Sequence, residues 1–256
     1  RSVRESSVRA AIVGYGRMGR EIERVLLDRE HTITAVVDPT GPDGAPAQVH
    51  KSLSARALSE CDVAIEFSLP EAVLDNARVY AQTGIPAVIG TTGWLDQMRD
   101  LESIMADASG GIIYGSNFSV GAHIFIAAAR YAASLVKDIA EYDLMIHEMH
   151  HRKKKDSPSG TALTLAEAVM DAVPRKTRIE TGRLDHAPEA DELHVSSSRC
   201  GSIPGTHTLY LDSAADTVEV RHQARSRGGF ALGAVLAAEW VIGKQAIHPV
   251  ESFVKD

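Results

Sequence analysis

The stretch VRAAIVGYGRMG at residues 8–19 joins a short apolar run to a glycine-rich turn of the form G-x-G-x-x-G. Such a turn between a strand and a helix is typical of dinucleotide-binding βαβ units, because its glycines allow a tight bend and close approach of a pyrophosphate to the helix N-terminus. Asp38 ends the following apolar run, at the spacing expected for a carboxylate that accepts hydrogen bonds from an adenosine ribose. The alternative, a turn that only packs a helix on a strand, is the weaker interpretation because it leaves this acidic residue unexplained.

Short apolar runs alternate with amphipathic segments as far as about Tyr114, the pattern of a parallel sheet covered by helices on both faces. The clearest helix is Glu71–Thr83, opened by Pro70 and followed by Gly84. This pattern predicts an α/β Rossmann-type fold with a doubly wound parallel sheet. The predicted strands are Val8–Val13, Thr32–Val37, Val63–Phe67, Pro86–Ile89 and Gly111–Tyr114.

The pattern changes after Gly121, where later strands follow one another without helices between them. A long apolar helix, His123–Val136, precedes a strand at Glu141–Glu148, and further strands are expected at Thr206–Leu211 and around residues 218–222. This order predicts a second, α+β domain. The predicted domains are residues 1–120 for dinucleotide binding, residues 121–226 for the α+β domain, and residues 227–256, whose buried helix Phe230–Ile242 returns to the first domain.

Composition excludes several classes of protein. The chain has 256 residues, 44% of them hydrophobic, which is enough for a sizeable core and excludes disorder as its main state. Its net charge of -7 opposes general nucleic-acid binding, and no apolar run approaches the ~20 residues that cross a bilayer. Cys61 and Cys200 are too few for a disulfide framework, so a reducing cytoplasm is expected. Residues 1–7 are expected to form a polar, frayed leader.

Two loops of small residues follow later strands of the predicted sheet. Gly90-Thr91-Thr92-Gly93 follows the fourth strand, and Ser116-Asn117-Phe118-Ser119-Val120-Gly121 follows the fifth. Ligands of open parallel sheets bind beyond the carboxyl ends of the strands, so both loops are expected to line one cofactor crevice together with the glycine turn. Each loop by itself is also compatible with a plain turn.

The most polar segment is EMHHRKKKDSPSGT at residues 148–161, for which four interpretations compete. A nucleic-acid patch is disfavoured because Glu148 and Asp156 bracket the basic run. A metal site is disfavoured because His150 and His151 point apart in an extended chain and no third ligand has suitable spacing. A solvated charged loop leaves the paired histidines and the Pro-Ser-Gly-Thr sequence unexplained. The fourth interpretation is an active-site loop for an anionic substrate.

The anion-binding interpretation has a physical basis. Ser159 is expected to cap a helix, so that Gly160 and Thr161 present backbone N–H groups to a carboxylate. The preceding cations face the same anion, and a histidine that titrates near neutrality can donate a proton. Further along, RSRGGF at residues 225–230 is either an interdomain hinge beside the cofactor or a plain surface loop. The apolar face of the expected helix consists of Ala162, Leu165, Ala166 and Val169.

One long motif, E-x-H-H-x-x-K-x-D-x-P-S-G-T-A, spans residues 148–162. Four shorter motifs accompany it, so that the set covers nearly the whole chain in order: GRMG at 16–19, GTTG at 90–93, NFSVG at 117–121 and GSIPGTH at 201–207. In these motifs the chain resembles the bacterial 4-hydroxy-tetrahydrodipicolinate reductases, also called dihydrodipicolinate reductases.

The resemblance implies a homotetrameric enzyme that reduces a small cyclic dicarboxylate with NADH or NADPH in lysine and diaminopimelate biosynthesis. Its second domain, residues 121–226, would bind substrate and build the subunit interface. The resemblance implies that His150 is the proton donor and Lys154 the second catalytic group, that His151 binds substrate, and that Gly160 and Thr161 hold a carboxylate. It implies no metal. The implied dinucleotide-binding residues are Gly14, Tyr15, Gly16, Arg17, Met18, Gly19, Asp38, Gly90, Thr91, Thr92, Ser116, Asn117, Phe118, Ser119, Arg227 and Phe230.

The sequence departs from the family pattern in two places. Its glycine turn is one residue shorter than in many members. Asp38 is followed by Pro39 and Thr40, where some members have an arginine that meets the 2′-phosphate of NADPH. The carboxylate of Asp38 would repel the 2′-phosphate of NADPH, and Arg17 is the one nearby cation that would offset this repulsion. We therefore expect NADH to serve at least as well as NADPH.

Two rival functions belong to other groups of proteins. The first is another two-domain NAD(P)-dependent amino-acid or sugar dehydrogenase, which needs a different substrate loop from the His-His-x-x-Lys run seen here. The second is a nucleotide-sensing or assembly protein without chemistry, which the intact His150, Lys154, Gly160 and Thr161 argue against.

Overall fold

The computed structural model describes residues 7–255, so the predicted polar leader lies outside the described residues except for Ser7. The chain divides into two compact units, one formed by Arg1–Val120 with Arg227–Asp256 and the other by Gly121–Ser226. Among the described residues, no helix is long and apolar enough to cross a membrane.

The first unit is built on a seven-stranded sheet in the order β12-β6-β5-β4-β1-β2-β3, and all its pairings are parallel. This confirms the predicted α/β doubly wound sheet. The two strands of this sheet that were not predicted from the sequence, β3 and β12, are edge strands of three residues each. The strands are β1 (Arg9–Val13), β2 (Thr32–Val37), β3 (Gln48–His50), β4 (Val63–Glu66), β5 (Ala87–Ile89), β6 (Ile112–Tyr114) and β12 (Ile247–Pro249).

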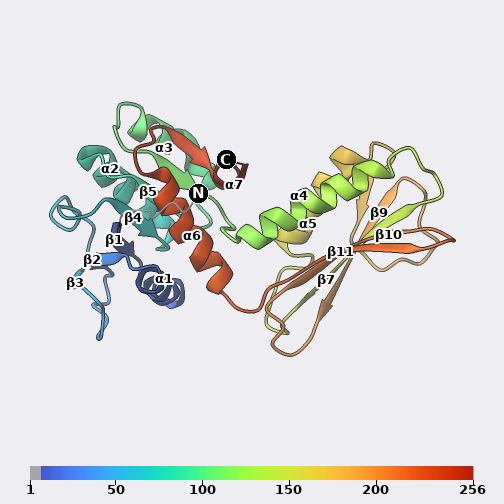
Figure 1. Cartoon of the computed structure of the whole chain (residues 1–256), viewed down its shortest axis with the longest axis horizontal. Helices are drawn as coiled ribbons and strands as arrows, with labels where there is room; N and C mark the ends of the chain where they lie inside the picture. Colours follow the sequence, from blue (N-terminus) through green and yellow to red (C-terminus); the bar gives the residue numbers. More distant parts are fainter. Residues whose placement is uncertain (1–6, 256) are drawn as a thin grey trace. The chain divides into compact units, whose positions relative to one another are not determined.

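Helices cover both faces of this sheet, as Figure 1 shows. Alternate residues of β1 enter two separate cores: Ala10 and Ile12 pack with α1 and α6, whereas Ala11 and Val13 pack with α2 and α3. Both faces of the strand are therefore apolar, which explains its continuous apolar sequence. The helical segments are α1 (Arg17–Asp28), η1 (Pro70–Ala72), α2 (Val73–Thr83), η2 (Leu95–Gln97), α3 (Met98–Met105), α6 (Gly228–Val241) and α7 (Val250–Lys255).

Helix α6 lies against the loop that follows β6. A Cβ atom at Gly233 would stand 1.6 Å from the carbonyl oxygen of Phe118, so only glycine allows this approach. The Phe118 ring is buried in the same core as α6 and meets Phe67 edge to face, with ring centroids 6.1 Å apart. Helix α6 thus holds the loop after β6 in place.

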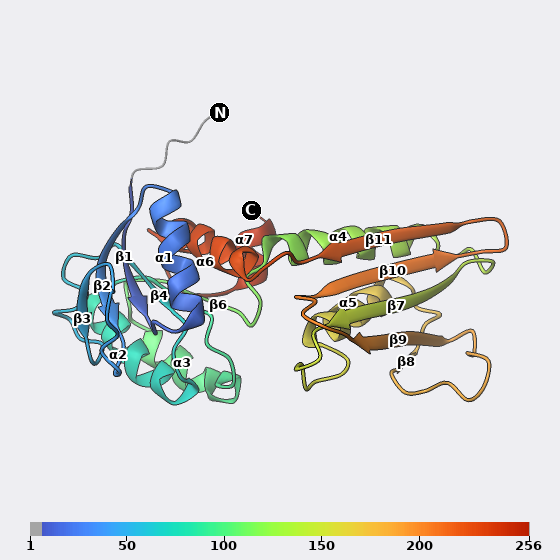
Figure 2. The same ribbon diagram turned by 90° about the horizontal axis from the view of Figure 1, so that it is seen from below.

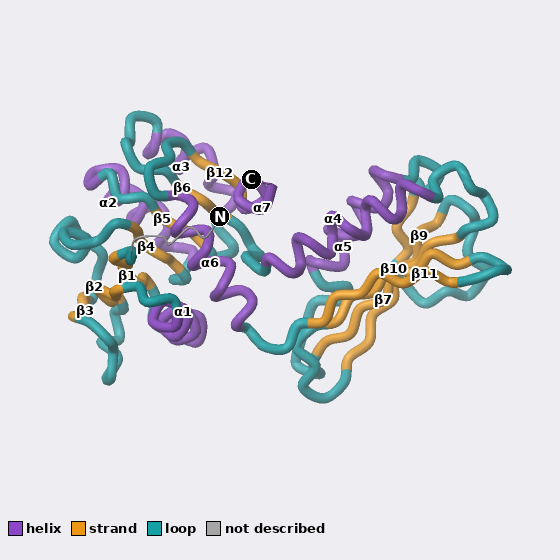
Figure 3. The backbone as a smooth tube through the Cα atoms, viewed as in Figure 1, coloured by secondary structure: helices purple, strands orange, loops and turns teal. Residues whose placement is uncertain are grey.

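The second unit contains a five-stranded sheet in the order β11-β10-β7-β9-β8, and Figure 2 shows these strands side by side. Strand β10 is antiparallel to both of its neighbours, whereas β7, β9 and β8 pair in parallel, so the sheet is mixed. Helices α4 (Val120–Leu135) and α5 (Gly160–Ala172) pack on one face of this sheet (Figure 3). The strands are β7 (Asp143–His150), β8 (Arg178–Glu180), β9 (Glu192–Arg199), β10 (Thr206–Asp212) and β11 (Thr217–Gln223).

The structure corrects one predicted strand. The strand expected at Glu141–Glu148 is observed at Asp143–His150, because β9 continues to pair with it as far as Arg199 beside His150. His150 is therefore the last residue of a strand and not the first residue of a loop.

A single methyl group on α6 tests the close approach of this helix to the loop after β6. Gly233→Ala is expected to destabilise the protein by about 1–3 kcal/mol, because the new methyl group overlaps the Phe118 carbonyl. Gly229→Ala is the matched control, since its Cβ would lie an ordinary 3.6 Å from Ser119 Oγ and alanine favours helix. Thermal unfolding followed by circular dichroism measures both. Equal melting temperatures for the two variants would show that α6 is not held this closely.

Candidate active site

The glycine turn forms a tight bend between β1 and α1. Gly14 has a φ of +88°, and a Cβ there would lie 2.2 Å from the carbonyl oxygen of Phe67. Gly19 packs against the Gly14 carbonyl, which its Cβ would approach to 2.4 Å. At Gly16 a Cβ would meet nothing within 4 Å, and no side chain caps the N-terminus of α1. This open helix start fits a pyrophosphate.

Only the backbone of Tyr15 faces the bend. Its side chain is 3% exposed, packs in the core under α1 and α6, and donates a hydrogen bond from its hydroxyl to Glu23. The Arg20 guanidinium lies over the ring, 4.8 Å from its centroid. Arg17 is exposed at the first position of α1, and Met18 is half-buried against the same core.

Asp38 follows β2 directly and joins it to the glycine turn. Its Oδ2 accepts a hydrogen bond from the Tyr15 N–H at 2.8 Å, and its Oδ1 accepts from the N–H and hydroxyl of Thr40 at 2.9 and 2.5 Å. Burial raises the pKa of Asp38, but the hydrogen bonds from Thr40 and Tyr15 outweigh it, so the pKa lies below the usual range. The half-buried carboxylate is therefore ionised and still has acceptor capacity.

A buried carboxylate that sequence analysis missed joins the next two loops. Glu66 ends β4 with no exposed surface and accepts hydrogen bonds from Ser68, Asn76 and Tyr80. Burial raises the pKa of Glu66, although these donors oppose the shift. The Ser68 N–H in turn donates to Thr91 Oγ1 at 2.8 Å. This network fixes the loop after β4 against the loop after β5.

The remaining predicted dinucleotide-binding residues fall into exposed and buried sets. Gly90 lies against the Phe67 ring, which a Cβ would approach to 2.1 Å. The Ser119 N–H donates to the Asn117 side-chain oxygen, so the loop after β6 forms its own turn. Phe118 is buried, and only its backbone can line a site. The exposed members are Thr92, Ser116 and Arg227, whereas Phe230 is half-buried.

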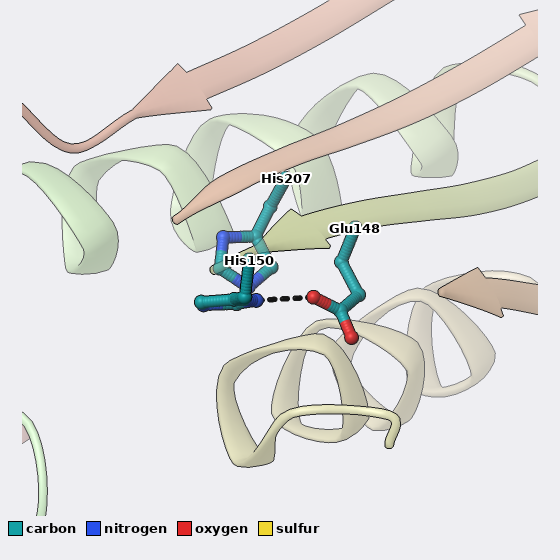
Figure 4. Close-up of side chains that lie close together, drawn as sticks. All are labelled: Glu148, His150 and His207. Carbon is teal, nitrogen blue, oxygen red and sulfur yellow. Dashed lines mark hydrogen bonds and ion pairs between the residues drawn. The ribbon is translucent and has the colours of Figure 1, made fainter. Parts of the chain in front are cut away.

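In the second unit, Glu148, His150 and His207 lie together at the ends of β7 and β10 (Figure 4). Glu148 and His150 are two residues apart on β7 and point to the same face, where the carboxylate Oε2 and the imidazole Nδ1 form a hydrogen bond. His207 is paired with Glu148 across the antiparallel register, and its ring meets that of His150 edge to face at 5.2 Å. All three residues are buried.

Further donors surround the Glu148 carboxylate. Arg199, the last residue of β9, lies 2.9 Å from Oε1, and the Ser159 N–H donates to the same oxygen at 3.3 Å. Burial alone would raise the pKa of Glu148, but the hydrogen bonds from His150 and Arg199 lower it to about 2. Glu148 is thus a buried anion throughout the neutral range.

His207 is held in the neutral form. Burial, and secondly the neighbouring His150, lower the pKa of His207 to about 4. Its Nε2 is bonded to Ser159 Oγ at 3.0 Å, and this hydroxyl accepts the Ala162 N–H as the N-cap of α5. The expected cap at Ser159 is confirmed, as is the buried helix face behind it. The imidazole therefore connects the sheet to the start of α5.

The same cluster is the one group of potential metal ligands among residues 7–255. One ligand atom from each of Glu148, His150 and His207 lies within 4.8 Å of the others, so His207 is the third residue that the sequence spacing did not reveal. Glu148 and His150 are hydrogen-bonded to each other, and the Arg199 guanidinium lies beside the Glu148 carboxylate. A fixed cation at this position opposes binding of a metal ion.

The polar loop between β7 and α5 carries the other predicted substrate and catalytic residues. Lys154 is ion-paired with Asp156 at 2.9 Å, with 23% of its side chain exposed, and His151 is half-buried. Gly160 begins α5, and a Cβ there would meet nothing within 4 Å, so the approach to this helix N-terminus is open. Thr161 follows it, half-buried.

Two residues of this cluster, His207 and Arg199, had no role predicted from the sequence. His207 lies in β10 on the same face as Leu209 and Leu211, which point toward the helices. Because residues at i, i+2 and i+4 of a strand share one face, these leucines are the sequence signal that His207 is buried. Arg199 ends a strand rich in serine, which gives no clear apolar pattern. Neither contact with Glu148 can be read from spacing along the chain.

Comparisons with known proteins identify relatives over nearly the whole chain. The family models "Dihydrodipicolinate reductase, N-terminus" and "Dihydrodipicolinate reductase, C-terminus" match residues 8–118 and 121–252. The 4-hydroxy-tetrahydrodipicolinate reductase of Christiangramia forsetii is 37% identical over 248 residues, which cover 96% of this chain and 97% of that protein. Its counterpart from Acinetobacter baumannii is 34% identical and covers 93% of this chain and 92% of its own length.

Two solved structures share the fold. A dipicolinate-bound dihydrodipicolinate reductase from Paenisporosarcina sp. TG-14 superposes with a TM-score of 0.78 at 24% identity, covering 96% of this chain and 99% of that one. GenD2 from gentamicin A biosynthesis, in complex with NAD, gives a TM-score of 0.61 at 13% identity, covering 99% and 92%.

The depressed pKa of His207 makes stability depend on pH. An unfolded histidine takes up a proton below about pH 6.5, whereas native His207 does so only near pH 4, so stability falls as the pH drops through this window, by at most about 3 kcal/mol. Glu148 contributes little between pH 7 and pH 5, because its pKa is about 2 in the native protein and its ordinary value is 4.5. His207→Gln should therefore lose less stability than the unchanged protein between pH 7 and pH 5 in urea unfolding. Comparison at pH 8, where the imidazole is neutral in both states, separates any packing defect. Parallel pH curves would show that His207 protonates freely in the native state.

Proposed function

Because the chain belongs to the dihydrodipicolinate reductase family, it is an NAD(P)H-dependent oxidoreductase, and we propose that it reduces 4-hydroxy-tetrahydrodipicolinate to tetrahydrodipicolinate with loss of water. The resemblance noted in the sequence is thereby confirmed, and the reaction belongs to lysine and diaminopimelate biosynthesis. The observation that carries this assignment is that the relatives match both units, the glycine turn as well as the polar loop. Another amino-acid or sugar dehydrogenase is not favoured, since a sugar dehydrogenase such as D-galactose-1-dehydrogenase from Rhizobium etli shares only the fold, at 15% identity.

The first unit supplies the dinucleotide site in this proposal. The bend at Gly14–Gly19 and the uncapped start of α1 would receive the pyrophosphate, and Asp38 would accept hydrogen bonds from the adenosine ribose. The loops after β5 and β6 would line the nicotinamide end, with Arg227 and Phe230 at the start of α6. When bound, the reduced nicotinamide supplies a hydride.

The second unit supplies the dicarboxylate site. Gly160 and Thr161 would bind one carboxylate at the N-terminus of α5, where the helix dipole and backbone N–H groups favour an anion. Lys154 and His151, in the loop before this helix, would contact the substrate once Lys154 exchanges Asp156 for it. His150 would donate a proton, since it ends β7 within the Glu148 cluster.

We infer that NADH serves at least as well as NADPH. The ionised Asp38 would repel the 2′-phosphate of NADPH, because both groups are negatively charged. Neither Pro39 nor Thr40 supplies a cation that would offset this repulsion. Arg17, exposed at the start of α1, is the cation that would offset part of this repulsion. The inference is therefore preference or dual use, not exclusion of NADPH.

We further infer a homotetramer formed through the second unit, in the cytoplasm. Within this unit, α4 and α5 cover only one face of the sheet, and the opposite face includes Met145, His147 and Tyr210. A sheet face of mixed apolar and polar side chains fits an interface between identical copies. Cys61 and Cys200 are both free thiols, as suits a reducing compartment.

NADH oxidation in the presence of the condensation product of pyruvate and aspartate semialdehyde tests the function. His150→Gln and Lys154→Ala are each expected to lower kcat about 10²–10⁴-fold while the affinity for NADH persists, because general acid catalysis contributes that range. Lys155→Ala is the matched control, an exposed lysine of the same loop. No substrate-dependent turnover by the unchanged protein would refute the proposed reaction. Normal kcat in either variant would remove that residue from the mechanism.

The ratio of kcat/KM for NADH and NADPH, measured at one salt concentration, tests the role of Asp38. Asp38→Ala should move this ratio about tenfold toward NADPH, equivalent to about 1.4 kcal/mol, because the like charge opposing the phosphate is removed. Asp43→Ala removes an exposed acidic residue from the same segment and should leave the ratio unchanged. A tenfold preference of the unchanged protein for NADPH would overturn the inference and indicate a phosphate site at Arg17.

A further inference from the structure

We propose that Glu148 is the positioning residue of the reaction: it holds His150 with Nδ1 bonded to the carboxylate and Nε2 directed to the substrate. This inference rests on the proposed function, in which His150 donates a proton. It adds a residue whose carboxylate is completely buried and therefore acts only through its neighbours.

The geometry of β7 fixes which imidazole nitrogen is engaged. Glu148 and His150 extend from the same face of the strand, and the hydrogen bond joins Oε2 to Nδ1 (Figure 4). A carboxylate only accepts, so Nδ1 carries the hydrogen, and the second ring nitrogen, Nε2, remains to exchange a proton. Without Glu148 the ring could equally adopt the other tautomer.

A glycine leaves space beside that second nitrogen. A Cβ at Gly205 would stand 2.9 Å from His150 Nε2, and the φ of +154° at this position favours glycine independently. Any side chain at residue 205 would crowd the atom that the proposed reaction uses. Glycine at residue 205 thus keeps a side chain away from Nε2, which agrees with a function at this nitrogen.

The carboxylate is itself held rigidly. Oε1 receives the Arg199 guanidinium at 2.9 Å and the Ser159 N–H at 3.3 Å, while Oε2 takes the imidazole. The same Arg199 also donates to the backbone carbonyl of Asp156 at 2.6 Å. Arg199 therefore connects Glu148 to the loop that carries Lys154, so the two proposed catalytic groups share one anchor.

The charges around His150 determine what Glu148 contributes. From β7 the ring faces the Glu148 anion, from β10 the neutral His207, from β9 the Arg199 cation, and the loop adds Lys154 with Asp156. Glu148 is the anion in direct contact with the His150 ring. During transfer the Nε2–H bond breaks and its electron pair stays on Nε2, the substrate gains the proton, and the neutral ring keeps its Nδ1–H bonded to Glu148.

Glu148→Gln tests this role because it keeps the size of the side chain and an acceptor but removes the charge. We expect kcat to fall at least about tenfold, with NADH affinity and competitive inhibition by pyridine-2,6-dicarboxylate unchanged. A merely structural role would weaken NADH and pyridine-2,6-dicarboxylate binding together with kcat. Asp191→Asn, which removes the same charge from an exposed ion pair with Arg178, is the matched control.

The unchanged protein offers a second measurement that does not depend on the variant folding. In ¹⁵N-correlated NMR, His150 should show the hydrogen on Nδ1 in the neutral ring, with His150→Gln used to assign the signal. Hydrogen on Nε2 would overturn the proposal, as would a Glu148→Gln variant with normal kcat beside a slow His150→Gln. Normal kcat in His150→Gln would instead refute the proton-donor role in the proposed function, which distinguishes the two failures.

Discussion

A buried carboxylate must be surrounded by donors, and this requirement organises the polar end of the second unit. Glu148 has no contact with solvent, so its two oxygens are satisfied by an imidazole, a guanidinium and a backbone N–H that come from three different parts of the chain. Removing any one donor leaves charge without compensation. The end of β7, the end of β9 and the start of α5 are therefore held at fixed positions by a single side chain.

The first unit reaches a comparable precision by another means, the absence of side chains. Gly14, Gly19 and Gly90 each stand where a Cβ would collide with backbone or with the Phe67 ring. Close packing there brings the ends of β1, β4 and β5 together, and the buried Glu66 ties two of the following loops to each other. Glycine contacts and a buried acidic group thus serve one purpose, a rigid edge of the sheet beyond which a ligand can bind.

Sequence pattern predicts an element correctly where the structure of that element depends mainly on its own residues. The apolar face of α5, the cap at Ser159 and the parallel strands follow from periodicity and from helix-start chemistry, which act within a few residues. The role of His207 was beyond such reasoning, because its contact with Glu148 depends on the register of β10 against β7. Strand β9 was missed since its serines lack apolar alternation, and the inward side chain of Tyr15 depends on Glu23 from the following helix.

The order of the chain also matters for how the protein is made. The sheet of the first unit includes β12, and its core under α1 is closed by α6, yet both elements lie in the last 30 residues, 227–256. The second unit is contiguous, with all its strands and helices between Gly121 and Ser226. During synthesis on the ribosome, the second unit can fold while the first unit still exposes Ala10, Ile12 and Ile22. The first unit is then completed only after residues 227–256 have been synthesised, so a chain truncated before them retains an aggregation-prone half beside a finished one.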